Sequence, residues 1–138
     1  MKNKKNVGLG ITSPDSTGST DKKSPFSGNI RLHGRNFIGT VISAKMQKTA
    51  TIEWERKVKV QKYERYMKKR SRIKAHNPDE IKAKEGDVVR IIETRPISKT
   101  NNFVIVEKIG KEKGFTQRME AIEASKKKVR EEMEEKQE

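Results

Sequence analysis

The densest group of side chains that could bind a ligand is a run of cations between residues 56 and 74. Ten lysines and arginines stand there against a single acid, Glu64. Because like charges at this density repel one another, we expect the segment not to be compact in free solution and to become stable when phosphates lie between the charges. The run predicts a nucleic-acid contact whose affinity is mostly electrostatic. Its cations are Arg56, Lys57, Lys59, Lys62, Arg65, Lys68, Lys69, Arg70, Arg72 and Lys74.

Two tyrosines, Tyr63 and Tyr66, lie inside this run. Aromatic rings among cations could stack on exposed bases, or they could pack over the base of the segment, and the sequence leaves both readings open. One Trp, two Tyr and four Phe make seven aromatic residues, too few for the extended stacking platform that single-strand binders use. Structured RNA, recognised through its phosphates and its shape, agrees better with this composition.

A second candidate site is a polar corner that follows a short apolar run. Arg95 precedes Pro96, which we expect to end a strand and to fix the direction of the chain. Ser98, Lys99 and Thr100 would then project from a stiff corner as two hydroxyls and one cation. Such a corner positions phosphates; the alternative is a structural turn whose polarity is incidental.

The sequence gives no support for catalysis. His33 and His76 both lie in basic surroundings, without a carboxylate placed to orient them, so we expect them to bind phosphate or to lie on the surface. Glu53 and Glu55 share one face of a strand, where pairing with neighbouring lysines explains them better than acid and base roles. The absence of cysteine excludes disulfides, thiolate zinc sites and cysteine nucleophiles. We predict no enzyme activity, no metal, no cofactor and no small-molecule substrate.

The overall charge agrees with a polyanion partner. The 138 residues include 33 Lys and Arg against 19 Asp and Glu, for a formal net charge of +14 and a pI near 10.0. Nucleic acid is the leading polyanion, and an anionic membrane surface is the second. No stretch approaches the roughly 18 apolar residues of a spanning helix, and no signal peptide is visible. We expect a soluble cytoplasmic protein with no membrane contact.

Charge and composition divide the chain into three zones. Residues 1–29 carry five basic and two acidic groups, residues 30–109 carry twenty and nine, and residues 110–138 carry eight of each. We expect residues 1–28 to form a flexible basic arm, either a disordered leader or an arm that becomes ordered on RNA. Residues 29–108 would form the one folded domain, and residues 109–138 a helical extension.

The central zone predicts five strands. Ala50, Ile52 and Trp54 alternate with polar residues in a long half-buried strand over residues 50–60. A β-rich segment over residues 37–46 precedes it, joined by the two residues Gln47 and Lys48, with a bend or bulge expected at Gly39. Five strands with short connections favour a small closed barrel, because closure removes exposed edges.

The remaining strands follow the same reasoning. Ser71, Ile73 and Ala75 define a third strand, and we expect the basic residues and His76 on its other face. Asn77 and Pro78 break the chain, and a loop or a single turn is expected before residue 86. The fourth strand begins after a turn at Gly86 and Asp87 and stops at Pro96, and a short fifth strand covers residues 103–106.

The last zone is typical of a helix of about five turns. Apolar side chains recur there at helical spacing, which indicates packing against a partner that the sequence does not identify. Acids from Glu131 to Glu138 stand where the helix dipole favours cations, so the final turns are expected to fray. The apolar stripe comprises Phe115, Met119, Ile122, Val129 and Met133.

Three blocks, in one order, resemble a known family. The first is Gly39, Val41, Ser43, Lys45, Met46, Lys48 and Thr49. The second, which looks like a long basic loop of that family, is Tyr63, Arg65, Tyr66, Lys68, Arg70, Arg72, Ala75, His76, Asn77 and Pro78. The third is Gly86, Asp87, Val89, Ile91, Glu93, Arg95, Pro96, Ile97, Ser98, Lys99 and Thr100. These blocks, and a short stretch ahead of them, resemble the universal small-subunit ribosomal protein number seventeen in its archaeal and eukaryotic form, over about residues 25–108.

The resemblance implies an all-β oligonucleotide/oligosaccharide-binding (OB) fold barrel, an early role in small-subunit assembly, and direct contact with small-subunit ribosomal RNA and neighbouring small-subunit proteins. Asn101 stands where the family usually has a lysine, which removes one expected phosphate contact. We expect the RNA-binding set to add to the ten cations Arg31, His33, Arg35, Lys45, Gln47, Lys48, Thr49, Tyr63, Tyr66, His76, Asn77, Arg95, Ser98, Lys99 and Thr100.

Two other functions remain as alternatives. A free nucleic-acid chaperone or initiation-type factor would meet single strands transiently and would depend on base stacking by the tyrosines. An RNA hydrolase would need a general acid and a general base, and the sequence offers no pair for those roles.

Overall fold

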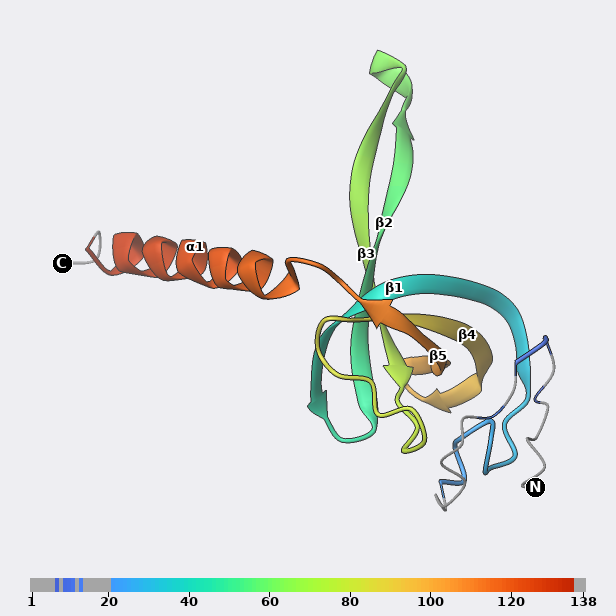
Figure 1. Ribbon diagram of the computed structural model, residues 1–138. Helices are drawn as coiled ribbons and strands as arrows, with labels where there is room; N and C mark the ends of the chain where they lie inside the picture. Colours follow the sequence, from blue (N-terminus) through green and yellow to red (C-terminus); the bar gives the residue numbers. More distant parts are fainter. Residues whose placement is uncertain (1–6, 8, 12, 14–20, 136–138) are drawn as a thin grey trace.

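The computed structural model describes residues 7, 9–11, 13 and 21–135. Five strands, one short 3-10 helix and one α-helix follow one another along the chain (Figure 1). They are β1 (Leu32–Met46), β2 (Thr49–Val60), η1 (Gln61–Tyr63), β3 (Arg65–His76), β4 (Asp87–Ser98), β5 (Asn101–Lys111) and α1 (Phe115–Glu135).

The five strands close into a barrel in the order β1-β2-β3-β5-β4. All neighbouring pairs are antiparallel except β3 and β5, which run parallel where Ala75 lies beside Phe103. Closure leaves the barrel without a free edge. The predicted five-stranded OB-type barrel is confirmed.

The interior of the barrel is filled by aliphatic side chains from all five strands. Ala50 and Ile52 on β2 are fully buried and contact residues of the other strands, as their alternation with polar residues predicts. Trp54 continues the same face and stacks on Phe37 of β1, with ring centroids 4.7 Å apart. The other fully buried members of this cluster are Val41, Ala75, Val89, Ile91 and Ile105.

A second apolar cluster lies on the outer face of β4 and β5. Ile92, Val104 and Val106 point away from the barrel interior and are covered by Ile11 and Phe26 from the N-terminal zone. Both faces of these two strands are therefore buried, which explains their continuous apolar runs. The N-terminal zone completes the core of the domain.

The structure differs here from the expected flexible arm. Much of the arm, residues 1–6, 8, 12 and 14–20, lies outside the described residues. Residues 21–28, by contrast, pack on the barrel, with Asp21, Ser24 and Phe26 all less than a tenth exposed. This packing could not be predicted, because the contacts are made to residues more than 50 positions away along the chain.

Three local features differ from the sequence prediction or refine it. Pro96 does not end β4, which continues to Ser98. The pairing of β4 with β5 is interrupted between Glu93 and Ser98. Because Pro96 lies in this interruption, its missing N–H removes no hydrogen bond between the two strands. Gly39 is not at a bulge. A Cβ at this position would lie 2.7 Å from the Glu53 carbonyl oxygen on β2, so glycine is required because β1 and β2 approach each other closely there. The β3–β4 connection has a single turn, as expected, in which the Pro78 carbonyl accepts two backbone hydrogen bonds.

The predicted C-terminal helix is confirmed as α1, whose 21 residues make about six turns. Figure 1 shows α1 leaving the end of β5 and extending away from the barrel. Val129 and Met133 are 49% and 62% exposed, so the distal part of the apolar stripe is not covered by the barrel.

Candidate nucleic-acid interface

The predicted cation run forms the outer part of a long β2–β3 hairpin. The two strands stay paired from Thr49 opposite His76 to Val60 opposite Arg65, and η1 closes the tip. Figure 1 shows this hairpin projecting well beyond the barrel. We call residues 56–74 the basic hairpin. The segment is an ordered antiparallel projection in the structure, rather than the loop that the sequence analysis expected.

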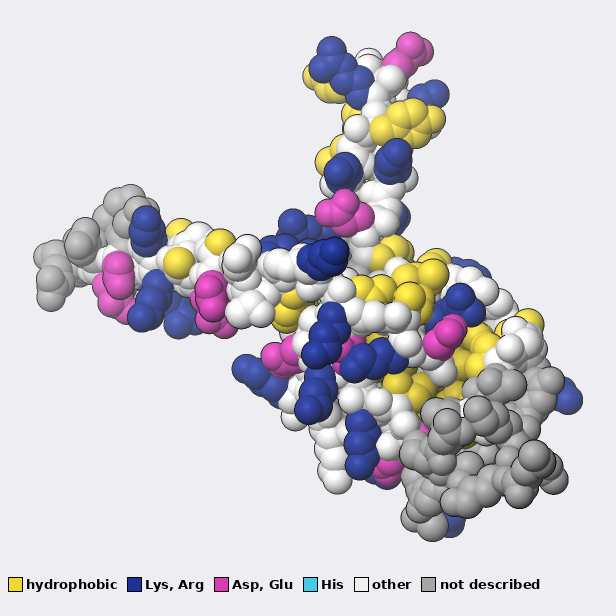
Figure 2. Space-filling model, in the orientation of Figure 1, with side chains coloured by type: hydrophobic (Ala, Val, Ile, Leu, Met, Phe, Trp, Pro, Cys, Tyr) yellow, Lys and Arg dark blue, Asp and Glu magenta, His cyan; other side chains and the backbone are white. Residues whose placement is uncertain are grey.

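The basic hairpin contacts solvent along almost its whole length. Residues 61–70 are all exposed, and Figure 2 shows Lys and Arg side chains distributed along the projection. Six residues of β2, 55–60, at about 3.3 Å each reach roughly 20 Å from the barrel. Within the described chain, no acidic partner pairs with the following cations: Arg56, Lys57, Lys59, Lys62, Arg65, Lys69 and Lys74.

Three cations of the basic hairpin do have acidic partners, all on glutamates near its root. Arg72 Nε donates to Glu53 Oε2 at 2.7 Å, and Arg70 Nε lies 4.0 Å from the other oxygen of that buried carboxylate. Lys68 Nζ lies 3.9 Å from Glu55. The two glutamates thus pair with basic side chains on the opposite strand and have no catalytic geometry. These pairs fix the root of the hairpin, and the cations beyond them stay available for a ligand.

Tyr63 and Tyr66 lie at the tip and are 65% and 70% exposed. Their rings do not cover the base of the segment, so the packing alternative is wrong. The Lys62 ammonium stands 5.5 Å from the Tyr63 ring centroid, where it adds positive charge to an aromatic face. Two exposed rings beside cations are suited to stacking on unpaired bases.

Two turns at one end of the barrel bring the second group of predicted residues together. Gln47 and Lys48 form the tight β1–β2 turn, and Lys99 and Thr100 form the β4–β5 turn. One pocket is lined by Gln47, Lys48 and Thr49 and by Ser98 and Asn101, which flank the β4–β5 turn, so segments about 50 residues apart share a surface. The predicted polar corner is therefore larger than the β4–β5 turn alone.

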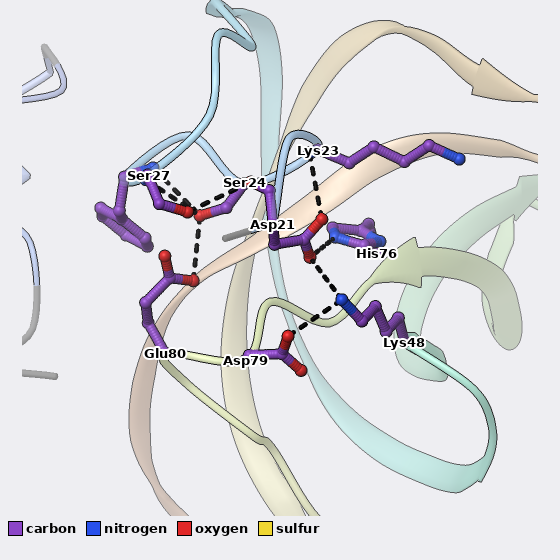
Figure 3. A network of polar contacts seen from close by, with 9 residues as sticks. Asp21, Lys23, Ser24, Ser27, Lys48, His76, Asp79 and Glu80 are labelled. Carbon is purple, nitrogen blue, oxygen red and sulfur yellow. Dashed lines mark hydrogen bonds and ion pairs between the residues drawn. The ribbon is translucent and has the colours of Figure 1, made fainter. Parts of the chain in front are cut away.

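Lys48 is held in place by two carboxylates, as Figure 3 shows. Its Nζ lies 2.9 Å from Asp79 Oδ2 and 3.7 Å from Asp21 Oδ2. The hydrogen bond to Asp79, helped by both negative charges, raises the pKa of Lys48 above its ordinary value. The ammonium is fixed in its charged form and keeps 42% of its side chain exposed.

His76 corrects the sequence analysis. Its ring is buried, and Nε2 lies 2.8 Å from Asp21 Oδ2, so the statement that no carboxylate orients it is wrong. Burial would raise the pKa of Asp21, but the Lys23 N–H, His76 and the Lys48 charge outweigh it and lower that pKa. His76 therefore anchors the N-terminal segment and has no surface to offer to phosphate.

Asn77 also has a structural position. Its side-chain oxygen accepts from the Ala83 N–H at 3.0 Å and its amide nitrogen donates to the Ala83 carbonyl at 2.9 Å. Both ends of the side chain are used to close the β3–β4 connection. We therefore leave Asn77 and His76 out of the contact surface proposed below.

The remaining predicted residues lie near the ends of β1 and on β4. Arg31, His33, Lys45 and Arg95 are exposed. Arg35 donates to Glu93 from both its backbone N–H and its guanidinium, at 3.1 and 3.3 Å. Those two bonds lower the pKa of Glu93, so this arginine is partly neutralised.

Lys22 and Lys23 were missed by the sequence analysis. Both are exposed and line the same pocket as the two turns. They lie in the zone expected to be a free arm, and contacts such as Asp21 with His76 and Ser24 with Glu80 place them beside the barrel. Two adjacent lysines by themselves do not indicate a binding site, because His76, which holds the neighbouring Asp21 in place, is 55 positions further along the chain.

Comparisons with known proteins identify the family. A model of the family described as Ribosomal protein S17 matches residues 39–107. The chain belongs to the ribosomal protein S17 family. Small ribosomal subunit protein uS17 of Methanocaldococcus jannaschii is 44% identical over 107 residues, 78% of this chain and 91% of that protein. The same protein of Haloquadratum walsbyi is 48% identical over 103 residues, 75% of this chain and 93% of the relative.

Family membership confirms the resemblance drawn from the three sequence blocks. The family match over residues 39–107 includes the basic hairpin and the β4–β5 turn and leaves out Lys22, Lys23 and α1. In the described ranges, no cluster of His, Asp and Glu is arranged to hold a metal ion. The same ranges contain no helix that is long and apolar enough to cross a membrane.

Proposed function

We propose that the chain binds folded small-subunit ribosomal RNA through the basic hairpin and through the two turns at the end of the barrel. As a member of the ribosomal protein S17 family it is a structural constituent of the small ribosomal subunit in the cytoplasm, and it is not an enzyme. The proposed direct partners are the ribosomal RNA and neighbouring small-subunit proteins.

The observation that carries this proposal is the exposed, mostly unpaired charge of the basic hairpin. Seven of its ten cations have no acidic partner within the described chain, and the projection buries none of them against the barrel. A charged strand pair that reaches about 20 Å from the domain can enter between RNA helices, where phosphates surround it. The barrel would then cap the junction from which those helices emerge.

We assign the three zones different roles. Residues 29–108 supply the RNA contacts, with residues 21–28 as an additional part of the same surface. In α1 five cations stand against six acids, so phosphate attraction is weak there, and its exposed Val129 and Met133 are suited to an apolar protein surface. We therefore assign residues 109–138 to contact with neighbouring ribosomal proteins.

A binding comparison tests the main proposal. Affinity should be measured for folded small-subunit ribosomal RNA and for polyuridine at about 150 mM salt, where non-specific attraction is weak. We expect clear preference for the folded RNA and loss of much of that affinity in a Lys57→Gln/Lys59→Gln variant. Equal affinity for both RNAs would contradict the proposal. Co-sedimentation with ribosomal particles at high salt would show whether the chain is a stable component.

A second function is favoured by the exposed tyrosines. Rings that are 65% and 70% exposed at the hairpin tip could also bind single strands transiently, as a chaperone would. That function predicts tight polyuridine binding that depends on Tyr63 and Tyr66. If polyuridine binds weakly and both tyrosine variants keep that weak affinity, the chaperone function is excluded.

A further inference from the structure

One pocket of the barrel is built by residues that the basic hairpin does not include. It has a volume of about 520 Å³ and lies between residues 21–23 and the β1–β2 and β4–β5 turns. A cavity of this size is large enough for a small organic group and larger than a single phosphate requires. Its polar lining includes Lys22, Lys23, Lys48, Thr49, Ser98 and Asn101.

From this lining we infer that the pocket receives one unstacked nucleotide of the ribosomal RNA. The inference rests on the proposed function and names the part of the RNA that this end of the barrel recognises. Lys22 and Lys23 would bind the phosphate, because neither has an acidic partner in the described chain. The hydroxyls of Thr49 and Ser98 would bind the ribose or a base edge.

The one acid in the pocket does not oppose this assignment. Asp21 Oδ2 lies 2.8 Å from His76 Nε2 and 3.7 Å from Lys48 Nζ, and its Oδ1 accepts from the Lys23 N–H at 3.1 Å. Figure 3 shows the carboxylate facing these three groups. Its charge is used within the protein, and the surface left for a ligand is positive.

The wall that carries the two lysines is pre-organised. Ser24 Oγ donates to Glu80 at 2.9 Å, its oxygen accepts from the Phe26 N–H, and the Gly28 N–H donates to the Ser24 carbonyl at 2.9 Å. A Cβ at Gly28 would meet the Lys22 carbonyl oxygen at 2.3 Å, so the loop closes tightly on itself only because residue 28 is glycine. A loop fixed in this way positions its lysines before the ligand arrives, which lowers the entropy lost on binding.

Asn101 gives an independent sign of a ligand. Its side chain is buried in the pocket wall, and Oδ1 has no hydrogen-bond partner among the described residues. Buried acceptors are nearly always paired. A ribose hydroxyl or a base amino group in the pocket would supply the missing donor after a small adjustment of the side chain.

The test compares three pairs of substitutions in the full-length protein. Lys22→Ala/Lys23→Ala changes the pocket, Lys57→Ala/Lys59→Ala changes the hairpin, and Lys126→Ala/Lys127→Ala on α1 removes the same charge elsewhere. Affinity for folded small-subunit ribosomal RNA is measured against salt, with hydroxyl-radical footprinting of each complex. We expect the pocket variant to lose protection at one short site and to have a salt slope shallower by about 1, because both lysines neutralise the phosphate of one nucleotide.

The outcomes separate this inference from the proposed function. If the pocket variant behaves like the α1 control while the hairpin variant loses affinity, the pocket does not bind RNA, although the proposed function stands. If the pocket variant instead shows weaker protection spread evenly over the whole footprint, the two lysines add only general electrostatic attraction. This result would also overturn the inference that the pocket receives one nucleotide. Unchanged affinity in both the pocket and hairpin variants would contradict the proposed function itself.

A Gly28→Ala variant tests the pre-organised wall with both lysines present. It should lose protection at the same site as the pocket variant, because the added Cβ displaces the Lys22 carbonyl. Thermal denaturation shows whether the barrel remains folded in this variant. Full protection of the RNA by a folded Gly28→Ala protein would overturn the role of the wall. If the Gly28→Ala protein unfolds, the Lys22→Ala/Lys23→Ala variant decides whether the pocket binds RNA.

Discussion

Asp87 is the most deeply buried charged side chain of the barrel. Its Oδ2 accepts from the Lys84 N–H at 2.8 Å and lies 2.7 Å from Lys108 Nζ. Burial would raise the pKa of this carboxyl, but the Lys108 and Lys84 hydrogen bonds outweigh it and lower the pKa. A carboxyl with a lowered folded-state pKa contributes stability above its unfolded value of about 3.9 and loses it as the pH falls through the folded pKa.

An Asp87→Asn variant should therefore be destabilised at neutral pH and less so in acid. We expect a loss of about 1.5 to 3 kcal/mol in the free energy of unfolding at pH 7, because the charged hydrogen bond between Asp87 and Lys108, which is 39% exposed, is lost. The difference from the wild type should shrink as the pH falls below about 4 and through the lowered pKa of Asp87, where the wild-type carboxyl becomes protonated as well. Urea unfolding across this range measures both effects.

Asp79→Asn is the control for that experiment. Asp79 is 39% exposed and pairs with a lysine that is itself 42% exposed, so its loss should cost less than about 1 kcal/mol. An Asp87→Asn difference that stayed constant from pH 7 to pH 2 would show that packing, and not charge, explains the effect.

The exposed tyrosines lead to a prediction about binding without a change in stability. Tyr63→Ala and Tyr66→Ala should each weaken binding to folded ribosomal RNA by about 1 to 3 kcal/mol if the ring stacks on a base. Tyr→Phe at either position should keep the affinity, because stacking needs the ring and not the hydroxyl. Equilibrium binding and thermal denaturation of the four variants distinguish these effects, and equal affinity of the Ala and Phe variants would exclude stacking.

Among the individual residues, the cations could be predicted from the sequence, but the contacts that some of them make could not. The types of residue in the basic hairpin were sufficient to predict phosphate binding, because a high density of positive charge is visible in a continuous stretch of sequence without knowledge of distant contacts. His76 was misread because its carboxylate, Asp21, is 55 positions away. Pairing with lysines was expected for Glu53, yet it is 7% exposed and pairs with arginines on the adjacent strand.

The β2–β3 hairpin changes its electrostatic character along its length. Near the barrel, Glu53 faces Arg72 and Glu55 faces Arg70, so opposite charges lie across from each other. Further out, Arg56 faces Lys69 and Lys57 faces Lys68, and like charges directly opposite are destabilising. The root of the hairpin is therefore stable in the free protein, and its distal part depends on counterions or RNA phosphates for stability.

Shortening the hairpin tests this division. Replacing residues 57–68 by Asn-Gly would join Arg56 to Lys69, which already face each other, by a favoured two-residue turn. We expect the barrel to keep its melting temperature, because the ion pair that the deletion breaks, Lys68 with Glu55, is exposed and contributes little to stability. Affinity for folded ribosomal RNA should fall, because five cations are lost. The log–log slope of affinity against salt should become shallower by about 0.7 to 0.9 for each of these cations that contacts a phosphate.

Deletion of residues 115–138 is the matched control. It removes six cations and seven acids, so the net charge of the rest rises by one. RNA affinity should be unchanged or slightly higher. A larger loss from this deletion than from the shortened hairpin would contradict the assignment of RNA contacts to β2 and β3.

At the element scale, periodicity predicted the strands well and their surroundings less well. The alternation in β2 identified its buried face, and helical spacing identified α1. The continuous apolar runs of β4 and β5 were read simply as strands, although burial on both faces is their usual cause. What covers their outer face could not be predicted, because Ile11 and Phe26 lie in a zone with almost no apolar periodicity.

The molecule as a whole separates stability from binding. The apolar residues form one closed barrel with an outer cluster, and twenty of the 33 basic residues lie between residues 30 and 109, against nine acids. A projecting positive surface on a rigid domain attracts RNA over distances comparable to the Debye length, about 8 to 10 Å in physiological salt. Association should therefore be fast and strongly dependent on ionic strength.

Salt titration of the wild-type protein measures how much of the affinity this surface supplies. If the basic hairpin and the two turns neutralise about 6 to 8 phosphates, the log–log slope of affinity against salt should lie near −5 to −7, and affinity should fall roughly 10³- to 10⁴-fold between 50 and 200 mM. The slope should be steep for folded ribosomal RNA and shallower for polyuridine, because a single strand condenses fewer counterions and cannot surround the hairpin. A slope shallower than about −2 for the folded RNA would mean that the exposed cations meet few phosphates, and the hairpin would then need another partner.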